Sequence, residues 1–263
     1  MSKKISVVIR NKNQADALDF LLKNLTSRYT DDIEEIIVID NLSTDNSHGI
    51  IKKYNGVKKV TIEKFSYGES ANLAAKSAES DIVVIFSAHA FPVSHDFFKL
   101  IKSSFEKNDN LAGLRCLHNN NDFTLYINGV SAKEEPNGAA VIFCGSAFNK
   151  KIWEELKFKG DIQTMEDKEW SKRVLEKGYD IEFVPSIFCY HIKRTPQQLF
   201  FRYKNEVIGG YQLWHEEYNF KTALRMLAGS LKKAFLLFVS SFYYAFRKFF
   251  FLLKFINHKP EKF

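Results

Sequence analysis

Four short polar motifs carry the residue types that could bind a nucleotide or catalyse a reaction. They are RNKN at 10–13, DNLSTDNS at 40–47, SAHA at 87–90 and MED at 165–167. The first three each follow a short apolar run typical of a buried strand. In an open parallel sheet, ligands bind beyond the carboxyl ends of the strands, so these motifs are predicted to meet at one site.

The first two motifs are suited to a nucleoside or a phosphate. Arg10 and Asn11 can meet a base or a phosphate, and the Asp40 carboxylate can accept hydrogen bonds from a ribose or a base. Ser43 or Thr44 can cap the next helix, so the second motif can also be read as a well-capped loop without a ligand.

The last two motifs contain groups that could act on protons or metals. Glu166 and Asp167 begin a helical pattern, where acids often only satisfy the helix dipole. The functional interpretation is that one carboxylate is a general base that removes a proton from an attacking hydroxyl. His89 is either a ligand-binding residue or a buried, hydrogen-bonded core histidine.

Alternating strand and helix patterns predict the elements that position these motifs. Apolar runs at 5–9, 36–39, 57–62 and 82–86 predict buried strands, with helical patterns at 18–25, 50–54 and 71–78 between them. This alternation indicates βαβ units, and therefore an α/β fold with a mostly parallel sheet flanked by helices. Later segments predict a helix at 166–177 and two strands, at 181–184 and 187–190.

Composition narrows the kind of partner and compartment. The 263-residue chain has a net charge of +7, which favours an anionic partner such as nucleic acid, a phosphorylated small molecule or a bilayer. Cys116, Cys144 and Cys189 form no CxxC pair, which argues against a disulfide framework or a structural zinc site. The N-terminus shows no signal-peptide pattern, so the catalytic part is expected in the cytosol.

The C-terminal segment 221–263 differs from the rest and is predicted to be a separate helical tail after a domain at 1–220. Residues 234–256 are dense in Phe and Tyr, yet the apolar stretch before Arg247 is shorter than the roughly 20 residues that span a bilayer. Lysines and arginines occur throughout the tail, which predicts amphipathic helices lying at a membrane surface. The alternative is a helix pair that packs on the protein's own core or forms a homo-oligomer.

Four stretches resemble the family 2 glycosyltransferases, which have the Rossmann-like GT-A fold and invert the anomeric carbon. The stretches are ISVVIRNKN, IIVIDNLSTDNS, FSYGESANLAAKSAESDIVVIFSAHAFP and MEDKEWSKRVLEKGYDIEFVP, within residues 5–215. Their order and spacing together carry the resemblance, which implies a nucleoside diphosphate sugar as the donor.

The resemblance also implies roles for individual residues. Asp167 would be the catalytic base that deprotonates an acceptor hydroxyl for in-line attack on C1 of the sugar, and Glu166 would orient that base or the acceptor. The donor would be bound by six residues: Arg10, Asn11, Asp40, Ser43, Asn72 and Ser87.

One departure from the family concerns the metal. The family places Asp-x-Asp after the fourth strand to hold Mn²⁺ or Mg²⁺, whereas this chain has Ser-Ala-His at 87–89. Three arrangements remain open. His89 and His191 hold a metal together, the diphosphate holds it with little help, or basic groups replace it, such as Lys193, Arg194 and Arg202.

These observations predict a glycosyltransferase that passes a sugar to a glycan or lipid-linked acceptor in cell-envelope polysaccharide synthesis. The tail is predicted to hold the enzyme peripherally on the cytoplasmic face of the membrane. The alternative is an inactive glycosyltransferase-like scaffold or nucleotide-binding subunit, which the missing Asp-x-Asp favours. A nucleotidyltransferase, a kinase and a dehydrogenase are disfavoured because GxxxxGK[ST] and GxGxxG are absent. Nucleic acid is not expected as a partner, because the basic tail is rich in apolar side chains.

Overall fold

The computed structural model describes residues 4–162, 164–190 and 194–263. It forms two units, one reaching to Leu213 and the other covering Trp214–Phe263, and each is described by itself. The division lies close to the predicted boundary after residue 220.

One eight-stranded sheet forms the centre of the first unit. Its order is β3 (Val57–Thr61), β2 (Glu35–Asp40), β1 (Ile5–Asn11), β4 (Ile82–Ser87), β7 (Gly145–Asn149), β6 (Leu111–Leu117), β8 (Asp180–Tyr190) and β5 (Ala90–Pro92). The first four of these strands are parallel neighbours, β7 is antiparallel to β4 and β6, and β6 and β8 are parallel. The predicted α/β fold with a mostly parallel sheet is confirmed.

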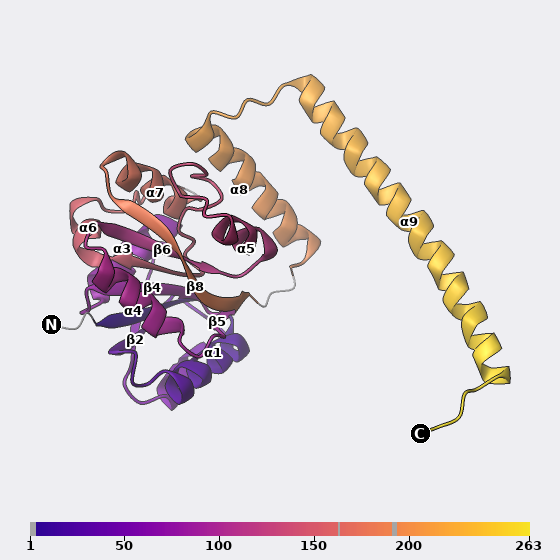
Figure 1. Cartoon of the computed structure of the whole chain (residues 1–263), viewed down its shortest axis with the longest axis horizontal. Coiled ribbons are helices and arrows are strands. Elements are labelled where there is room, and N and C mark those ends of the chain that lie inside the picture. Colours follow the sequence, from indigo (N-terminus) through magenta and orange to yellow (C-terminus); the bar gives the residue numbers. More distant parts are fainter. Residues whose placement is uncertain (1–3, 163, 191–193) are drawn as a thin grey trace. The chain divides into compact units, whose positions relative to one another are not determined.

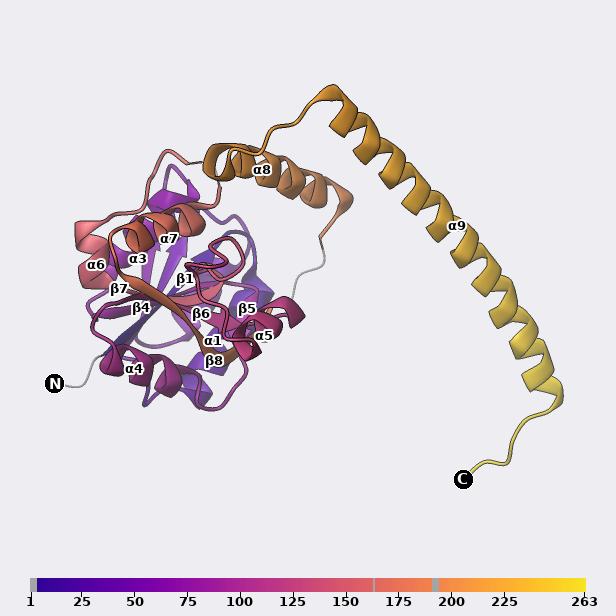
Figure 2. The same cartoon turned by 45° about the horizontal axis from the view of Figure 1, so that its top comes forward.

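Helices cover both faces of this sheet (Figures 1 and 2). One face packs on α1 (Ala15–Arg28), α2 (Ser47–Lys53) and α4 (Phe97–Lys107), and the other on α3 (Tyr67–Ser77), α6 (Lys150–Glu155) and α7 (Glu166–Glu176). Successive side chains along each strand point to opposite faces of the sheet, so each strand contributes to the hydrophobic layers on both faces. In β1, Val7 faces the α1 side and Val8 faces the α3 side, and both are fully buried.

Small residues allow α3 to lie close to its neighbours. Ala71, Ala74 and Ala75 are fully buried against the sheet. A Cβ atom at Gly68 would lie 1.9 Å from the backbone oxygen of Lys159, so only glycine fits there. The start of α3 is therefore held against the loop that leads towards α7.

The later part of the chain differs from the sequence-based expectation in one strand. The segments 181–184 and 187–190 form the single strand β8 rather than two strands. Val184 pairs with Cys116, and Ile187 pairs with the next residue, Leu117. The strand thus continues through a bulge that absorbs Pro185 and Ser186.

Three further helices complete the described chain. α5 (Asn120–Ile127) follows β6, and α8 (Pro196–Trp214) follows β8. The tail is one continuous helix, α9 (Phe220–Asn257) of 38 residues, where several helices were predicted. It contains no proline to interrupt it, and Asn219 caps its start by accepting a hydrogen bond from the Thr222 amide at 2.9 Å.

Candidate active site

A cleft of about 740 Å³ lies at the carboxyl ends of β1, β4 and β6. It is also lined by Asn137, by residues 142–144, by the start of α7 and by one face of α8. The sheet register explains why the first motifs meet there, because Asn11 pairs with Asp40 and Arg10 pairs with Ser87. Three of the four predicted motifs line the cleft directly, and the fourth contributes Asn41.

The loops after β1 and β2 are joined by hydrogen bonds. Asn11 Nδ2 donates to Asp40 Oδ1 at 3.1 Å and to Ser43 Oγ at 3.2 Å. The backbone N–H of Ser43 donates to Asp40 Oδ2 at 3.1 Å. Asp40 is buried and its carboxylate holds these loops, while Asn11 itself lines the cleft. Asn11 Oδ1 is buried and has no partner among the described residues, so it is a free acceptor at the cleft.

Two further residues were predicted to bind the sugar donor, and only Ser87 of the two lies at the cleft, whereas Asn72 lies away from it. Ser87 lines the cleft. Asn72 is not one of the described residues that line the cleft. Its Nδ2 donates to Phe158 O at 2.9 Å, and its Oδ1 accepts from Phe158 N at 3.1 Å and from Trp153 Nε1 at 2.9 Å. These bonds indicate that Asn72 fixes the loop after α6.

The two carboxylates at the start of α7 have different surroundings. Glu166 is buried, and its Oε1 accepts from Arg10 Nη1 at 3.1 Å. Burial and the adjacent Asp167 raise the pKa of Glu166 to about 7, although Arg10 opposes the shift. Asp167 is partly exposed in the cleft, and its Oδ2 accepts from the Phe143 backbone N–H at 3.1 Å. Asp167 is therefore the carboxylate that a ligand can reach.

Glutamine at position 166 is expected to change how stability depends on pH. The folded-state pKa of about 7 exceeds the ordinary 4.5, so folded Glu166 retains its proton where the unfolded chain has lost it. The free energy of unfolding should then fall as pH rises from about 4.5 to about 7. Glu166→Gln should remove that part of the slope in denaturant titrations, whereas Glu176→Gln, at the exposed end of α7, should keep it. An unchanged slope in Glu166→Gln would contradict the assignment.

The start of α7 is fixed by an unusual backbone and by α8. Met165 precedes the helix in the left-handed region, with φ of 62°. A Cβ atom at Gly209 of α8 would lie 2.5 Å from Met165 Sδ. The close approach of α8 therefore holds Met165, the residue directly before Glu166 and Asp167.

His89 is placed in the cleft as a neutral imidazole. Its Nδ1 lies 2.6 Å from Gln14 Oε1, and its ring meets Tyr190 edge to face at 4.7 Å. Burial, together with Arg194 and Arg10 nearby, lowers the pKa of His89 to about 4. Its Nε2 is buried without a partner in the described part of the chain.

The described residues do not form a metal site by themselves. Within 4–162, 164–190 and 194–263, no three His, Cys, Asp or Glu residues come together to hold an ion. His89 offers one imidazole nitrogen, whereas Mg²⁺ prefers several oxygen ligands. His191, its predicted partner, lies outside the described residues, as does Lys193.

The cleft is instead rich in fixed positive charge. Six Lys or Arg side chains line it, against three Asp or Glu: Arg10, Lys12, Arg115, Lys168, Arg194 and Arg202, against Glu166, Asp167 and Glu206. Arg194 is held in place because its Nη2 donates to Tyr190 Oη at 2.6 Å. Such a cleft suits an anionic ligand such as a diphosphate.

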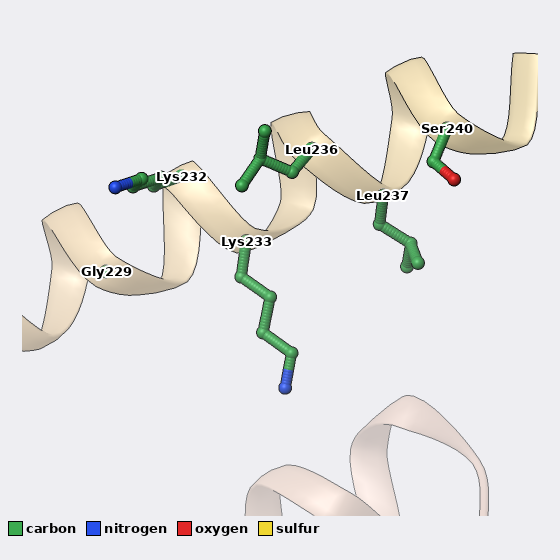
Figure 3. A pocket seen from close by; sticks show the side chains of 6 residues that line it. All are labelled: Gly229, Lys232, Lys233, Leu236, Leu237 and Ser240. Carbon is green, nitrogen blue, oxygen red and sulfur yellow. The ribbon is translucent and has the colours of Figure 1, made fainter. Parts of the chain in front are cut away.

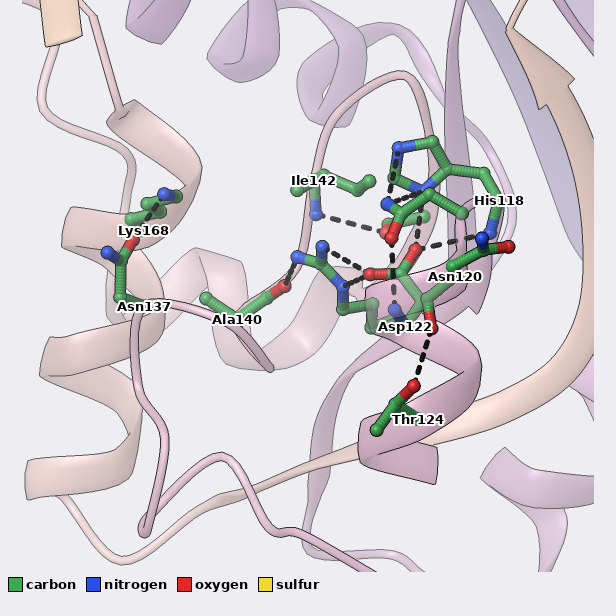
Figure 4. Close-up of polar contacts among 11 residues, drawn as sticks. His118, Asn120, Asp122, Thr124, Asn137, Ala140, Ile142 and Lys168 are labelled. Carbon is green, nitrogen blue, oxygen red and sulfur yellow. Dashed lines mark hydrogen bonds and ion pairs between the residues drawn. The ribbon is translucent and has the colours of Figure 1, made fainter. Parts of the chain in front are cut away.

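A buried ion-pair network that sequence reasoning missed adjoins the cleft (Figure 4). Asp122 is fully buried, and its Oδ1 accepts from Arg115 Nη2 at 2.7 Å. Its Oδ2 lies 2.5 Å from His118 Nδ1, and the His118 ring stacks on Phe188 at 4.9 Å. His118 lines the cleft, so this network fixes an imidazole there.

A signal for this network is present in the sequence. The polar run HNNND at 118–122 directly follows the apolar segment of β6, just as RNKN follows β1. Asn119 caps α5 by accepting a hydrogen bond from the Asp122 amide at 3.0 Å. The same strand-end argument that selected the other motifs would have selected this one.

Comparison with known families decides the identity of this fold and cleft. Residues 6–161 match the family model "Glycosyl transferase family 2". The chain belongs to glycosyl transferase family 2. It is therefore a glycosyltransferase with the GT-A fold, and the predicted resemblance is confirmed.

Relatives of this family 2 glycosyltransferase act on sugars. A dolichyl N-acetyl-α-D-glucosaminyl phosphate 3-β-D-2,3-diacetamido-2,3-dideoxy-β-D-glucuronosyltransferase of Methanococcus voltae is 25% identical over 233 residues, which are 75% of this chain and 70% of that protein. A Pyrobaculum calidifontis mannosyltransferase solved with GDP-Man and Mn²⁺ has a TM-score of 0.67 at 17% identity, covering 83% of this chain and 66% of that one, slightly under two thirds. Glucosyl-3-phosphoglycerate synthase of Mycobacterium tuberculosis has a TM-score of 0.61 at 15% identity, covering 79% and 78%.

Proposed function

We propose that this family 2 glycosyltransferase transfers a sugar from a nucleoside diphosphate donor to a hydroxyl of a glycan or lipid-linked acceptor in cell-envelope polysaccharide synthesis. The observation that carries the proposal is one cleft that holds the strand-end loops, a cluster of basic side chains and the reachable Asp167 carboxylate. The relatives that use nucleotide sugars support the donor class. The Methanococcus voltae relative, named for a dolichyl phosphate-linked substrate, supports a lipid-linked acceptor.

The residues have distinct proposed roles in this reaction. The Asp167 carboxylate takes the proton of the acceptor hydroxyl, whose oxygen attacks C1 of the sugar while the bond from C1 to the diphosphate breaks. Glu166 positions this region through its bond to Arg10. The donor is proposed to be bound by Arg10, Asn11 and Ser87, which line the cleft, while Asp40 and Ser43 are proposed to act through the Asn11 loop that they hold. Inversion at C1 is proposed from family membership.

The leaving diphosphate needs positive charge around it. Arg194 and Arg202 line the cleft and are suited to neutralise it. A divalent metal, Mn²⁺ or Mg²⁺, held by His89 and His191 stays a prediction, since His89 supplies only one free nitrogen in the described part of the chain.

The tail is proposed to bind the cytoplasmic membrane surface peripherally. α9 is long and apolar enough to cross a membrane by length and composition alone. At 1.5 Å per residue, however, it is about 57 Å long, almost twice the hydrocarbon core of about 30 Å. It carries seven Lys or Arg and no Asp or Glu along its length. These features favour a helix lying in the interface of an anionic membrane.

One side of α9 is continuously apolar, whereas the other side mixes basic and apolar side chains. One stripe at helical spacing contains Phe220, Leu224, Leu227, Leu231, Phe235, Phe238, Phe242, Phe249, Leu253 and Ile256, all exposed. Lys233 and Leu237, one turn apart, project to the same side of the helix (Figure 3). Lysines placed in this way can bury their stems in the headgroup region while the ammonium groups meet lipid phosphates.

Donor binding is expected to appear as a rise in melting temperature. A nucleoside diphosphate at one hundred times its dissociation constant adds about 2.7 kcal/mol, which is a rise of roughly 5–10 °C for a chain of this size. Melting of the full chain should be followed with UDP, dTDP, GDP and CDP, each with Mn²⁺, Mg²⁺ or EDTA. A shift by one diphosphate that Mn²⁺ increases and His89→Ala reduces would support the metal prediction. Equal shifts in EDTA would assign neutralisation to basic residues, and no shift with any nucleotide would overturn the proposed donor.

A further inference from the structure

The apolar side chains of α8 lie mostly on the side that faces solvent, and its polar side chains lie mostly on the side that faces the rest of the unit. The face towards the cleft is mostly polar: of its five lining residues, Gln198, Arg202, Asn205 and Glu206 are polar and Phe201 is apolar. The opposite face is apolar and lies in solvent: Leu199 is 53% exposed, Phe200 61%, Tyr203 44% and Tyr211 56%. A helix of a globular protein ordinarily turns its apolar stripe inward. The outer face of α8, defined as Leu199, Phe200, Tyr203 and Tyr211, is therefore without a partner in the described chain.

The outer face has a fixed orientation relative to the cleft. Gly209, Gly210 and Leu213 are the buried residues of α8, and Gly209 packs against Met165 at the start of α7. The polar face closes one side of the cleft, so the apolar face must point away from it. Both views place α8 at the outside of the first unit, beside α7 (Figures 1 and 2).

The chemistry of the outer face matches a membrane interface. Tyr has a preferred depth at the headgroup level, where its apolar ring and its polar hydroxyl are both satisfied. Phe and Leu side chains beside it can enter the acyl boundary, as on the apolar face of an interfacial helix. Lys204 joins this surface, because its Nζ lies 5.4 Å from the centre of the Phe200 ring. The one acidic residue of α8, Glu206, lines the cleft and is paired with Arg202 at 2.6 Å. The outer face therefore presents aromatic rings and positive charge and no acid, which complements an anionic lipid surface.

We propose that the outer face of α8 binds the headgroup region of an anionic bilayer, as a membrane contact within the catalytic unit and separate from α9. Since the other face of the same helix lines the cleft, this contact would set the cleft at headgroup depth. The sugar of a lipid-linked acceptor could then reach Asp167 without leaving the membrane. This inference rests on the proposed lipid-linked acceptor.

Site-directed nitroxide labels on the full chain test the contact directly. In a Cys189→Ser background, which removes the exposed thiol, single labels are placed by Tyr203→Cys on the outer face and by Lys76→Cys on the exposed side of α3. With phosphatidylglycerol–phosphatidylcholine vesicles, the Tyr203 label should gain accessibility to oxygen and lose it to a water-soluble nickel complex. The Lys76 label should stay accessible to nickel. A Tyr203 label that stays in water, or becomes shielded from both reagents as in a protein–protein contact, would overturn the proposal.

A combined variant links the contact to turnover. Phe200→Ser with Tyr203→Ser and Tyr211→Ser removes rings that do not line the cleft. KM for a vesicle-embedded lipid-linked acceptor should rise about tenfold or more, while kcat with a water-soluble acceptor analogue should stay unchanged. If the combined variant and the parent chain had equal KM values for the embedded acceptor, the contact would be contradicted. Immersed labels without any sugar transfer by the parent chain would instead reject the proposed function and leave the contact standing.

Discussion

Asp167→Asn is expected to lower kcat about 10³-fold while the nucleoside diphosphate still raises the melting temperature. The amide keeps the size of the side chain, and its one oxygen can accept from the Phe143 N–H, which lies 3.1 Å from Asp167 Oδ2, while the bond from the Lys168 N–H to Oδ1 is lost. It cannot take up the proton of an acceptor hydroxyl, and a positioned general base contributes roughly 10²–10⁴-fold to such reactions. Sugar transfer from a radiolabelled donor, measured alongside melting curves, separates chemistry from binding.

A matched control for this prediction is Asp161→Asn. Asp161 is an exposed acid shortly before α7, and its loss should leave turnover unchanged. Full activity of Asp167→Asn would remove Asp167 from the role of base. Since Glu166 shares the start of α7 and has a pKa of about 7, Glu166→Gln would then be the next variant to measure.

Neutralising the first half of α9 is expected to release the enzyme from anionic vesicles. The variant carries Lys221→Gln, Arg225→Gln, Lys232→Gln and Lys233→Gln. Each basic residue near an anionic surface contributes about 1 kcal/mol, so the four together should weaken vesicle binding roughly 10³-fold. Co-sedimentation with phosphatidylglycerol vesicles at low and high salt measures the change, and the parent chain should show the stronger salt dependence.

The control for the tail keeps the overall change of charge constant. Replacing Lys52, Lys76, Lys99 and Lys107 by glutamine alters four exposed lysines of the first unit. Vesicle binding of this control should stay close to that of the parent chain. Similar losses in both variants would show that net charge, rather than the tail, drives association.

Local patterns were enough to predict the strands that carry the nucleotide-binding end. β1, β2 and β4 are continuous apolar runs because both of their faces are covered by helices, and such runs stand out in a sequence. The single strand β8 was read as two because Pro185 interrupts the pattern, whereas pairing with β6 carries the strand through a bulge. Whether a proline ends a strand depends on its neighbour, which the local sequence does not contain.

The same limit applies to the cleft. Because Arg10, Ser87 and His89 follow the ends of predicted parallel strands, they were predicted to lie at one site, and in the structure all three line the cleft. That reasoning could not identify the different burial of Glu166 and Asp167, which depends on the position of Arg10, more than 150 residues earlier in the chain. Asn72 was assigned to the donor from its motif, yet its amide is occupied by Trp153 and Phe158. Such pairings arise from tertiary packing.

The way α8 joins the first unit has a consequence for how this lineage can change. Its burial in the core is limited to Gly209, Gly210 and Leu213, and the side chains it presents to the cleft are outside the core. The nucleotide end is different, because Asn11, Asp40 and Ser43 depend on one another through hydrogen bonds. Mutations of the α8 side chains that line the cleft are therefore expected to change the free energy of unfolding little, whereas mutations in the strand-end loops are expected to lower it. Apart from Arg202, which is proposed to meet the leaving diphosphate, the cleft side chains of α8 can therefore change in such an enzyme while the strand-end loops are kept.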